Sequence, residues 1–314
     1  MVRVGIDLGG TNVAFGITKE DGTLICKSSV PTKRDLDADS LVVYIAESVF
    51  AWLQEQGIKE EEIASIGMGV PGISDDTTGV IVYTTNLPFY HTKAREIFNR
   101  YTKCPLRMSN DANCAALGEV ICGAAKGYKN SLTVTLGTGV GGGVIIDGKI
   151  YCGFNGAGGE LGHMQIHSDG ALCGCGRNGC LEAHASATAI IRETVKALEE
   201  HPESEIAKLC EGDPTKINAK TAFDAMRAGD AVGTAIVKKY IEDLGEGIIN
   251  YINIFQPEII LIGGGVSKEG ENLLAPLREY VFKYAYGADL LPRTRIEKTM
   301  LGNDAGIIGA AMIE

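Results

Sequence analysis

The residues best suited to chemistry lie in one stretch, 156–186, which holds three of the nine cysteines and three of the five histidines. The cysteines are Cys173, Cys175 and Cys180, and glycines lie between them. Glycine permits the tight turns that three converging sulfurs require, so this spacing predicts a metal-ligand cluster. His163, His167 or His184 could supply a fourth ligand. A first hypothesis therefore places the chemistry of the protein in this stretch.

Two carboxylates flank the same cysteines. Glu160 precedes them and Glu182 follows, so a loop that the cysteines hold together also brings two acidic side chains near one another. The other six cysteines are scattered singly. In a reducing compartment, a clustered trio of cysteines is typical of metal binding rather than of disulfide formation.

The composition is that of an ordinary soluble globular protein. The 314 residues suffice for two domains with their own cores, and 45% are hydrophobic while 22% are charged. The net charge of −11 leaves no basic surplus, so we expect neither a nucleic-acid partner nor a membrane-surface partner. The first residues enter a strand pattern without a leader, and no apolar run reaches membrane-spanning length. We therefore expect a cytoplasmic protein.

One structural plan occurs twice, about half a chain apart. Residues 2–6 alternate as a strand, a glycine loop follows, and residues 13–18 resume the strand pattern before an Asp-Gly turn. Residues 132–150 follow the same order. The repeat predicts a duplicated α/β fold in which each half presents a glycine loop toward a shared ligand cleft. Because no linker separates the halves, the repeat itself places the boundary near residue 115.

The glycine loops fit neither of the common nucleotide-binding motifs. Residues 137–142 match GxGxxG, but a strand and a hairpin follow where that motif requires a helix. Residues 143–149 match GxxxxGK, but Ile150 stands where a serine or threonine should bind Mg²⁺. The sequence therefore predicts neither a GxGxxG dinucleotide-binding site nor a GxxxxGK phosphate-binding loop.

The same loops nevertheless offer unhindered backbone N–H groups and a hydroxyl, which suit a polyphosphate. The first loop contains Gly9, Gly10, Thr11 and Asn12, and the second contains Gly137, Thr138 and Gly139. Asp7, just before the first loop, could orient Mg²⁺ or its water. Each loop alone is as consistent with a plain tight turn, but two loops with the same flanks favour phosphate binding.

Asp111 is the candidate general base. It follows a short predicted strand, 106–108, and precedes a predicted helix, 112–122, which is where active sites of α/β proteins gather. Phosphoryl transfer to a hydroxyl needs a carboxylate that accepts the proton. The competing interpretation is that Ser109, Asn110 or Asp111 only caps the helix.

Motifs across essentially the whole chain resemble the ROK family of sugar kinases and transcriptional regulators. They are DLGGTN at 7–12, GVPG at 69–72, TNLP at 85–88, NDAN at 110–113, LGTGVGGG at 136–143, ExGH at 160–163, CxCGxxGCxE at 173–182, LIGGGVS at 261–267 and LGNDAGIIGAA at 301–311. The stretch with cysteines and histidines is the most specific, because DLGGT is shared with many actin-like ATPases.

The resemblance implies an actin-like, ribonuclease-H-like pair of α/β domains that close over ATP and a sugar. Residues 1–115 and 303–314 would form the smaller domain, and 116–302 the larger one with the zinc motif. Asp111 matches the base for the 6-hydroxyl of the sugar. The positions that match sugar ligands are Asn86, Asn110, Glu160, His163 and Glu182. Those that match structural zinc ligands are His163, Cys173, Cys175 and Cys180. Gly10, Thr11, Asn12, Thr138 and Gly139 match the phosphate loops, and Gly264 and Gly265 the adenosine end.

The expected reaction converts Mg²⁺·ATP and a hexose, with glucose the expected sugar, into ADP and the 6-phosphate. The alternatives are a kinase for another hexose, such as N-acetylmannosamine or N-acetylglucosamine, and a sugar-sensing repressor. A repressor needs a helix-turn-helix ahead of the first strand, whereas Met1 leads straight into that strand. The family favours a dimer or tetramer. Two positions depart from its pattern: His184 replaces a usual tyrosine, and Phe89-Tyr90 a frequent glycine-tryptophan.

Overall fold

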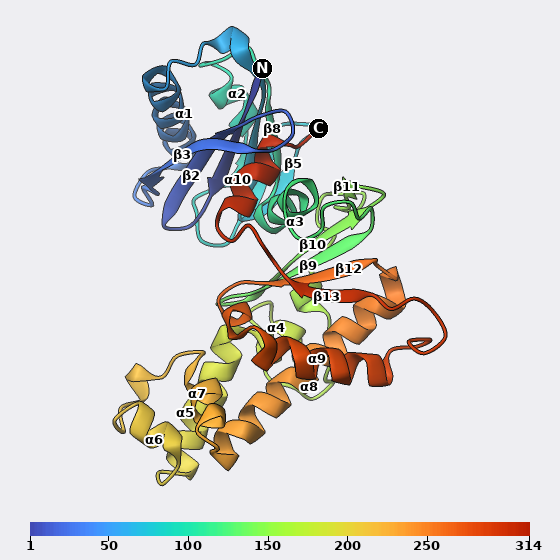
Figure 1. Ribbon diagram of the computed structural model, residues 1–314. Coiled ribbons are helices and arrows are strands. Elements are labelled where there is room, and N and C mark those ends of the chain that lie inside the picture. The colour runs from blue at the N-terminus through green and yellow to red at the C-terminus, as the bar shows by residue number, and fades with distance from the viewer. The chain divides into compact units, whose positions relative to one another are not determined.

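The computed structural model describes every residue, Met1–Glu314, and contains two compact units (Figure 1). The first comprises Met1–Thr133, Gly143–Gly159 and Thr299–Glu314, and the second comprises Val134–Gly142 and Glu160–Lys298. One five-stranded sheet has the order β3-β2-β1-β4-β8, and the other repeats it as β11-β10-β9-β12-β13. The predicted duplicated α/β fold is therefore confirmed, while the predicted domain limits stay a prediction. None of the helices combines the length and apolar character that a membrane crossing requires.

The sheet of the first unit brings three predicted motifs to one edge. Its strands are β1 (Val2–Leu8), β2 (Asn12–Thr18), β3 (Leu24–Pro31), β4 (Ile63–Val70) and β8 (Leu106–Asn110). β1, β2 and β3 form antiparallel hairpins, whereas β1, β4 and β8 run parallel. Because parallel strands end at the same edge, DLGGTN, GVPG and NDAN, which begin in the last residues of β1, β4 and β8, all lie there.

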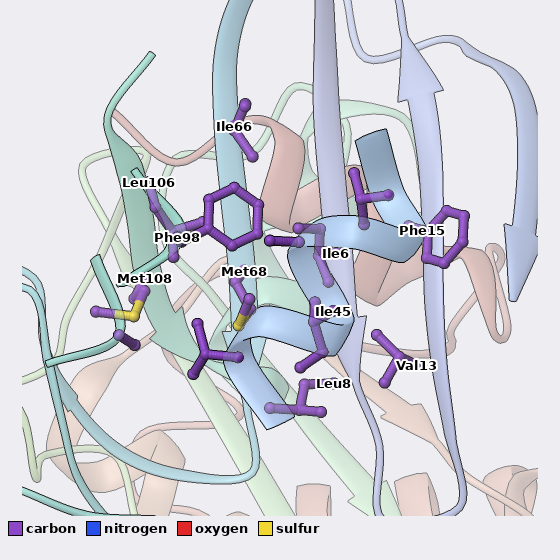
Figure 2. Packing of buried hydrophobic residues seen from close by; sticks show 14 of the residues in the cluster. Ile6, Leu8, Val13, Phe15, Ile45, Ile66, Met68, Phe98, Leu106 and Met108 are labelled. Carbon is purple, nitrogen blue, oxygen red and sulfur yellow. The ribbon is translucent and has the colours of Figure 1, made fainter. Parts of the chain in front are cut away.

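Buried side chains explain why the first helix lies on this sheet. Helix α1 (Ala38–Glu55) begins where the Asp37 side chain accepts the Ser40 N–H, and it buries residues at helical spacing. Figure 2 shows Ile45 of this helix among Ile6 and Leu8 of β1, within a core that also includes Phe98. Phe98 ends the short helix α2 (Ala94–Phe98).

Small residues seat the last helix directly on the sheet. Helix α10 (Asp304–Ala311) packs on β1 and β4 and against α3 (Asp111–Ile121). A Cβ on Gly5 of β1 would lie 1.9 Å from the Ile307 carbonyl oxygen, and one on Gly67 of β4 equally close to that of Ala310. Only glycine permits this backbone contact. The fully buried Glu119 of α3 accepts the N–H groups of Met300 and Leu301 just ahead of α10.

The remaining elements of the first unit are smaller. A three-stranded sheet consists of β5 (Gly72–Asp75), β6 (Val80–Thr84) and β7 (Tyr90–Thr92), in that order. A single turn of 3-10 helix, η1, spans Glu60–Glu62. β5 pairs antiparallel with β6, and β6 with β7, so residues 85–89 form the turn of a hairpin.

The second five-stranded sheet contains the second glycine loop. Its strands are β9 (Ser131–Leu136), β10 (Val140–Ile146), β11 (Lys149–Ile150), β12 (Ile259–Gly263) and β13 (Arg295–Lys298). Two of the four limits between the compact units fall within β9 and β10. β12 is buried along its whole length and runs parallel to β13. Such burial is typical of a parallel strand in a sheet that is covered on both faces.

A long helix organises the rest of the second unit. α8 (Ala231–Phe255) begins at the capping Asp230 and ends at Gln256, which has a left-handed backbone conformation. Its buried Tyr240 and Tyr251 donate hydrogen bonds to the carbonyls of Ala185 and Leu161. The other helical elements are η2 (Leu161–His163), α4 (Leu181–Ala185), α5 (Ala187–Glu200), α6 (Glu205–Leu209), η3 (Pro214–Lys216), α7 (Thr221–Arg227), η4 (Val266–Glu269) and α9 (Glu271–Tyr284). The two tyrosines thus fix η2 and α4, which carry predicted site residues.

Candidate active site

The first glycine loop, residues 9–12, joins β1 to β2 at the carboxyl edge of the sheet. The Gly9 N–H donates to the Asn12 carbonyl at 3.0 Å and closes the turn. Thr32, which follows β3, donates its hydroxyl to Gly9 O at 2.7 Å and its N–H to Thr11 O at 2.8 Å. Thr11 and Asn12 remain exposed. The loop is therefore fixed from one side and accessible to a ligand through these two residues.

Asp7 and Asp111 lie near one another because of the strand register. Asp7 of β1 pairs with Gly69 of β4, which pairs with Ser109 of β8, two residues before Asp111. Burial, and then the negative charge of Asp111, raises the pKa of Asp7 to about 6. The Asp7 carboxyl therefore loses its proton at a higher pH than an ordinary aspartate does. Two neighbouring carboxylates offer oxygen ligands that suit Mg²⁺.

The helix cap at this site is Asn110 rather than Asp111. The Asn110 Oδ1 atom accepts the N–H groups of Ala112 and Asn113, at 2.9 and 3.2 Å, and its Nδ2 atom donates to Gly72 O. Asp111 is the first residue of α3, where the helix dipole favours a negative charge, and its Oδ1 also lies 2.8 Å from the Ala112 nitrogen. The cap thus depends on Asn110, which still has one amide hydrogen for a sugar hydroxyl.

Asn86 lies in the first unit with Asn110 and Asp111, in the turn between β6 and β7. Its side chain is exposed. The two residues that depart from the family pattern have different environments: Phe89 is buried in the core, whereas Tyr90 is 73% exposed. Of the two, only Tyr90 is therefore available to a ligand.

The second glycine loop contacts a predicted sugar ligand. The Val140 N–H, directly after Gly139, donates to the Glu182 Oε2 atom at 3.0 Å. A Cβ on Gly139 would lie 2.3 Å from that oxygen, so a larger residue would displace the carboxylate. The Thr188 hydroxyl holds the other side of the loop by donating to Thr138 O at 2.7 Å. Residues 137–139 and Glu182 therefore form one connected group in the second unit.

The four predicted zinc ligands converge. Ligand atoms of His163, Cys173, Cys175 and Cys180 all lie within 4.8 Å of one another. The Cys175 and Cys180 sulfurs are 3.6 Å apart, as are the Cys173 sulfur and His163 Nδ1. A zinc tetrahedron with bonds of about 2.3 Å to sulfur and 2.0 Å to nitrogen has edges of about 3.5–3.8 Å. All three cysteines are free thiols, so the group fits zinc.

Local backbone geometry creates this cluster. Gly176 and Gly179 have φ angles of +87° and +75°, a region that disfavours other residues. A Cβ on Gly179 would lie only 1.5 Å from the His167 carbonyl oxygen. An isolated bridge between Leu172 and Asn178 closes the turn that carries Cys173 and Cys175. The glycine spacing that predicted convergence is therefore needed for it.

The cluster also touches predicted sugar ligands. The Cys173 sulfur lies 3.5 Å from the Glu182 Oε1 atom. His163 directs Nδ1 toward Cys173, which leaves Nε2 as a donor for a sugar hydroxyl. Glu160, the residue before η2, is exposed. The second unit therefore links Glu182 and His163 through the cysteines and places Glu160 one short turn from His163.

His167 and His184 form a different group with Asp243 of α8. The three ligand atoms lie within 4.8 Å, and His167 Nε2 is 2.7 Å from the carboxylate of Asp243. The Ala171 N–H donates to His184 Nε2 at 3.1 Å, so the proton of the neutral ring is on Nδ1, the atom facing Asp243. A metal at Nδ1 would need the opposite tautomer, and Lys239 already contacts Asp243. This hydrogen bonding favours a partly buried polar network over a metal site.

Gly264 and Gly265 follow β12 in the second unit and differ in their surroundings. A Cβ on Gly264 would lie 2.4 Å from the Leu136 carbonyl oxygen, and its φ is +80°. A Cβ on Gly265 would meet nothing within 4 Å. Gly264 is thus required by the fold, whereas Gly265 leaves open space beside the chain.

A large pocket of the second unit does not contain the predicted site residues. It has a volume of about 1040 Å³ and lies in the second unit beside α5 and α8. Its lining includes His167, His184 and Asp243, but none of the predicted sugar or phosphate ligands. Those ligands are divided between the units: Asp7, residues 10–12, Asn86, Asn110 and Asp111 belong to the first, and the others to the second.

Three side chains that contact the glycine loops were not predicted from the sequence: Thr32, Arg34 and Thr188. The Arg34 Nε atom donates to Gly10 O at 2.5 Å. The hairpin of β2 and β3 pairs Asn12 with Pro31, so residues 32–34 return beside the first loop. Counting residues on either side of the predicted Asp-Gly turn would have revealed this proximity.

Comparisons with known proteins agree with this architecture. The chain is 38% identical to a glucokinase of Halalkalibacterium halodurans over 99% of this chain and 94% of that protein. It is equally identical to a glucokinase of Thermotoga maritima over 99% and 96%. A solved ROK family glucokinase of Streptomyces griseus, in complex with glucose and AMPPNP, matches with a TM-score of 0.80 and 32% identity over 99% of this chain and 98% of that one.

The duplicated sheets and their glycine loops thus define an α/β protein with the actin-like ATPase fold of ROK sugar kinase structures. The ROK family model matches residues 3–314. The chain belongs to the ROK family.

Proposed function

We propose that this protein is an ATP-dependent glucokinase, which transfers the γ-phosphoryl group of ATP to the 6-hydroxyl of glucose. The observation that carries the proposal is the position of Asp111, at the first turn of α3 and near Asp7 before the first glycine loop. A base and a phosphate-binding loop at one sheet edge are what transfer to a hydroxyl requires. The resemblance to glucokinases supports glucose over other hexoses.

In this mechanism Asp111 accepts the proton of the 6-hydroxyl while that oxygen bonds to the γ-phosphorus and the bond to ADP breaks. Asn110 provides the cap of α3, so the cap does not depend on the carboxylate of Asp111. We therefore assign that carboxylate as the acceptor of the hydroxyl proton. Backbone N–H groups of residues 10–12 and 137–139 would orient the phosphates. Gly265, with its open surroundings, suits the adenosine end. Asp7 would hold Mg²⁺, which neutralises phosphate charge when bound.

The zinc cluster has a structural role in this proposal. Four protein ligands complete a tetrahedron, which leaves no position for a catalytic water. His163, Cys173, Cys175 and Cys180 would hold the ion, and Glu182 and His163 would be fixed as sugar ligands together with Glu160, Asn86 and Asn110. Buried carboxylates and amides discriminate between sugars because a missing hydroxyl leaves a partner unpaired. We expect the protein to form a homodimer or homotetramer.

A sugar panel tests the proposal. Purified protein is incubated with Mg²⁺·ATP and glucose, mannose, N-acetylglucosamine or N-acetylmannosamine, and ADP formation is measured. We expect the highest kcat/KM with glucose and little ADP without sugar, since water should be excluded from the reacting group. A higher kcat/KM with an N-acetyl sugar would support the alternative ROK kinase. No sugar-dependent ADP formation, with sugar-dependent DNA binding, would support a repressor.

The raised pKa of Asp7 predicts a pH dependence of Mg²⁺ use. Asp7 becomes mostly protonated below pH 6, so we expect the KM for Mg²⁺ to rise about fivefold as the pH falls from 6 to 5. Raising the pH should improve the use of Mg²⁺ but lower the stability of the metal-free protein. Because the folded-state pKa of about 6 exceeds the ordinary aspartate pKa of 3.8 that applies in the unfolded chain, the free energy of unfolding without Mg²⁺ should decrease as pH rises from 3.8 to 6.

Asp7→Asn separates the two effects. Above pH 6 without Mg²⁺ it should be more stable than the wild type, by on the order of 3 kcal/mol in the free energy of unfolding, yet nearly inactive. The measurements are denaturant unfolding and Mg²⁺ titrations of activity between pH 5 and 8. Asp39→Asn, an exposed aspartate in α1, serves as the control and should keep the wild-type profile. Unchanged Mg²⁺ affinity in Asp7→Asn would contradict the assignment.

A further inference from the structure

Arg34 lies over the first glycine loop without a partner of opposite charge. Its Nε atom donates to Gly10 O at 2.5 Å. Its Nη2 atom lies 2.9 Å from the point where a Cβ of Gly10 would be, so the guanidinium covers the open face of that glycine. Arg34 is exposed and forms no salt bridge. An unpaired cation is thus fixed beside the loop predicted to bind phosphate.

The segment that carries Arg34 is anchored at the same loop. Thr32, two residues earlier, makes hydrogen bonds to Gly9 O and Thr11 O. The neighbouring Lys33 points elsewhere, because its ammonium group lies 4.3 Å from the centre of the Tyr44 ring. Of the two adjacent cations, only Arg34 contacts the glycine loop. Its position therefore results from the fold rather than from a general excess of positive charge.

The chemistry of the guanidinium suits a phosphate ligand. While the Nε–H group donates its hydrogen bond to Gly10 O, the Nη1 and Nη2 groups still present donors in a planar fork that matches phosphate oxygens. The carbonyl of Gly10 also orients the side chain in advance, so less entropy is lost when the phosphate binds. A fixed cation at the transferred group stabilises the charge that develops in the transition state.

We propose that Arg34 is a further catalytic residue, which contacts the terminal phosphates of the nucleotide held at residues 10–12. The inference rests on the proposed kinase function. Arg34 exchanges no proton: the proton of the sugar hydroxyl passes to Asp111, and the bond that breaks is the one between the γ-phosphorus and the oxygen that leaves with ADP. Arg34 donates hydrogen bonds to phosphate oxygens throughout this step.

Three variants distinguish this role from a structural one. Arg34→Ala removes both the charge and the bond to Gly10 O, Arg34→Gln keeps an N–H donor without the charge, and Arg34→Lys keeps the charge. We expect kcat/KM for ATP to fall about 10- to 100-fold in Arg34→Ala and Arg34→Gln, with partial recovery in Arg34→Lys. The KM for glucose should change less than about twofold, because Asp111 and the sugar ligands are intact. Lys33→Ala is the matched control and should retain wild-type kinetics.

The kinetics of the three Arg34 variants distinguish a catalytic role of Arg34 from a structural one. If Arg34→Gln restores the activity lost in Arg34→Ala, the residue only holds the loop and the proposal is overturned. Wild-type kinetics in all three Arg34 variants overturn it as well. Thermal melting shows whether each variant is folded, and the comparison of Gln with Lys remains decisive if Arg34→Ala does not fold. Failure of the kinase function itself is recognised separately, because the wild-type protein would then phosphorylate no sugar.

Discussion

Asp111→Ala is expected to reduce kcat for glucose phosphorylation by about 10²- to 10⁴-fold, the usual contribution of a general base. The affinities for glucose and for ATP should remain near those of the wild type. The reason is structural: Asn110 caps α3, so the helix keeps its first turn when Asp111 is replaced. Steady-state kinetics give kcat, and equilibrium titrations give the two affinities.

A control variant excludes a general effect of charge at a helix N-terminus. Asp39 occupies the first turn of α1 and is exposed, so Asp39→Ala removes the same side chain from a comparable position. It should leave kcat unchanged. Asp111→Asn should be about as slow as Asp111→Ala, because an amide keeps the shape but cannot accept the proton at neutral pH. Near-normal turnover in both Asp111 variants would exclude Asp111 as the base.

Cys175→Ser is expected to lower zinc content, stability and glucose affinity together. Cys175 is exposed, so replacing its sulfur with oxygen loses almost no apolar burial. Any large effect must therefore come from the lost ligand. Structural zinc contributes directly to folding, and we expect the melting temperature to fall by about 10 °C or more. Elemental analysis, thermal melting and glucose titration measure the three quantities.

The link to glucose binding follows from two contacts. The Cys173 sulfur lies 3.5 Å from the Glu182 carboxylate, and His163 Nδ1 lies 3.6 Å from the same sulfur. Loosening the cluster should therefore displace both predicted sugar ligands. Wild-type protein stripped of metal by a chelator is the matched control and should reproduce the variant. A folded, zinc-free Cys175→Ser protein with unchanged glucose affinity would show that the cluster does not position them.

Several features of this protein could be predicted because they depend on short segments. The cysteines converge through local turns whose glycines are visible in the sequence, and the structure brings the four predicted ligands together. The amphipathic pattern of α1 and the repeat of strand, glycine loop and strand are also local. Such patterns act over a few residues, so the backbone has few alternatives.

The tertiary structure decided which groups meet. The spacing of residues alone left three histidines open as the fourth ligand, and α8 favours His163 because Asp243 engages His167 and His184. The raised pKa of Asp7 comes from its burial and from Asp111, which reaches it through the register of three parallel strands.

Arg34 shows the same limit at the proposed active site. Its sequence neighbourhood contains two adjacent cations, and nothing in their order distinguishes them. The hairpin of β2 and β3 places Arg34 over Gly10, while Lys33 lies at Tyr44. The sequence by itself therefore determined the elements, the loops and the convergence of the three cysteines, all of which arise from local spacing. Pairing between distant strands and packing of α8 decided the electrostatic environment of those residues, because electrostatic effects depend on distances in space.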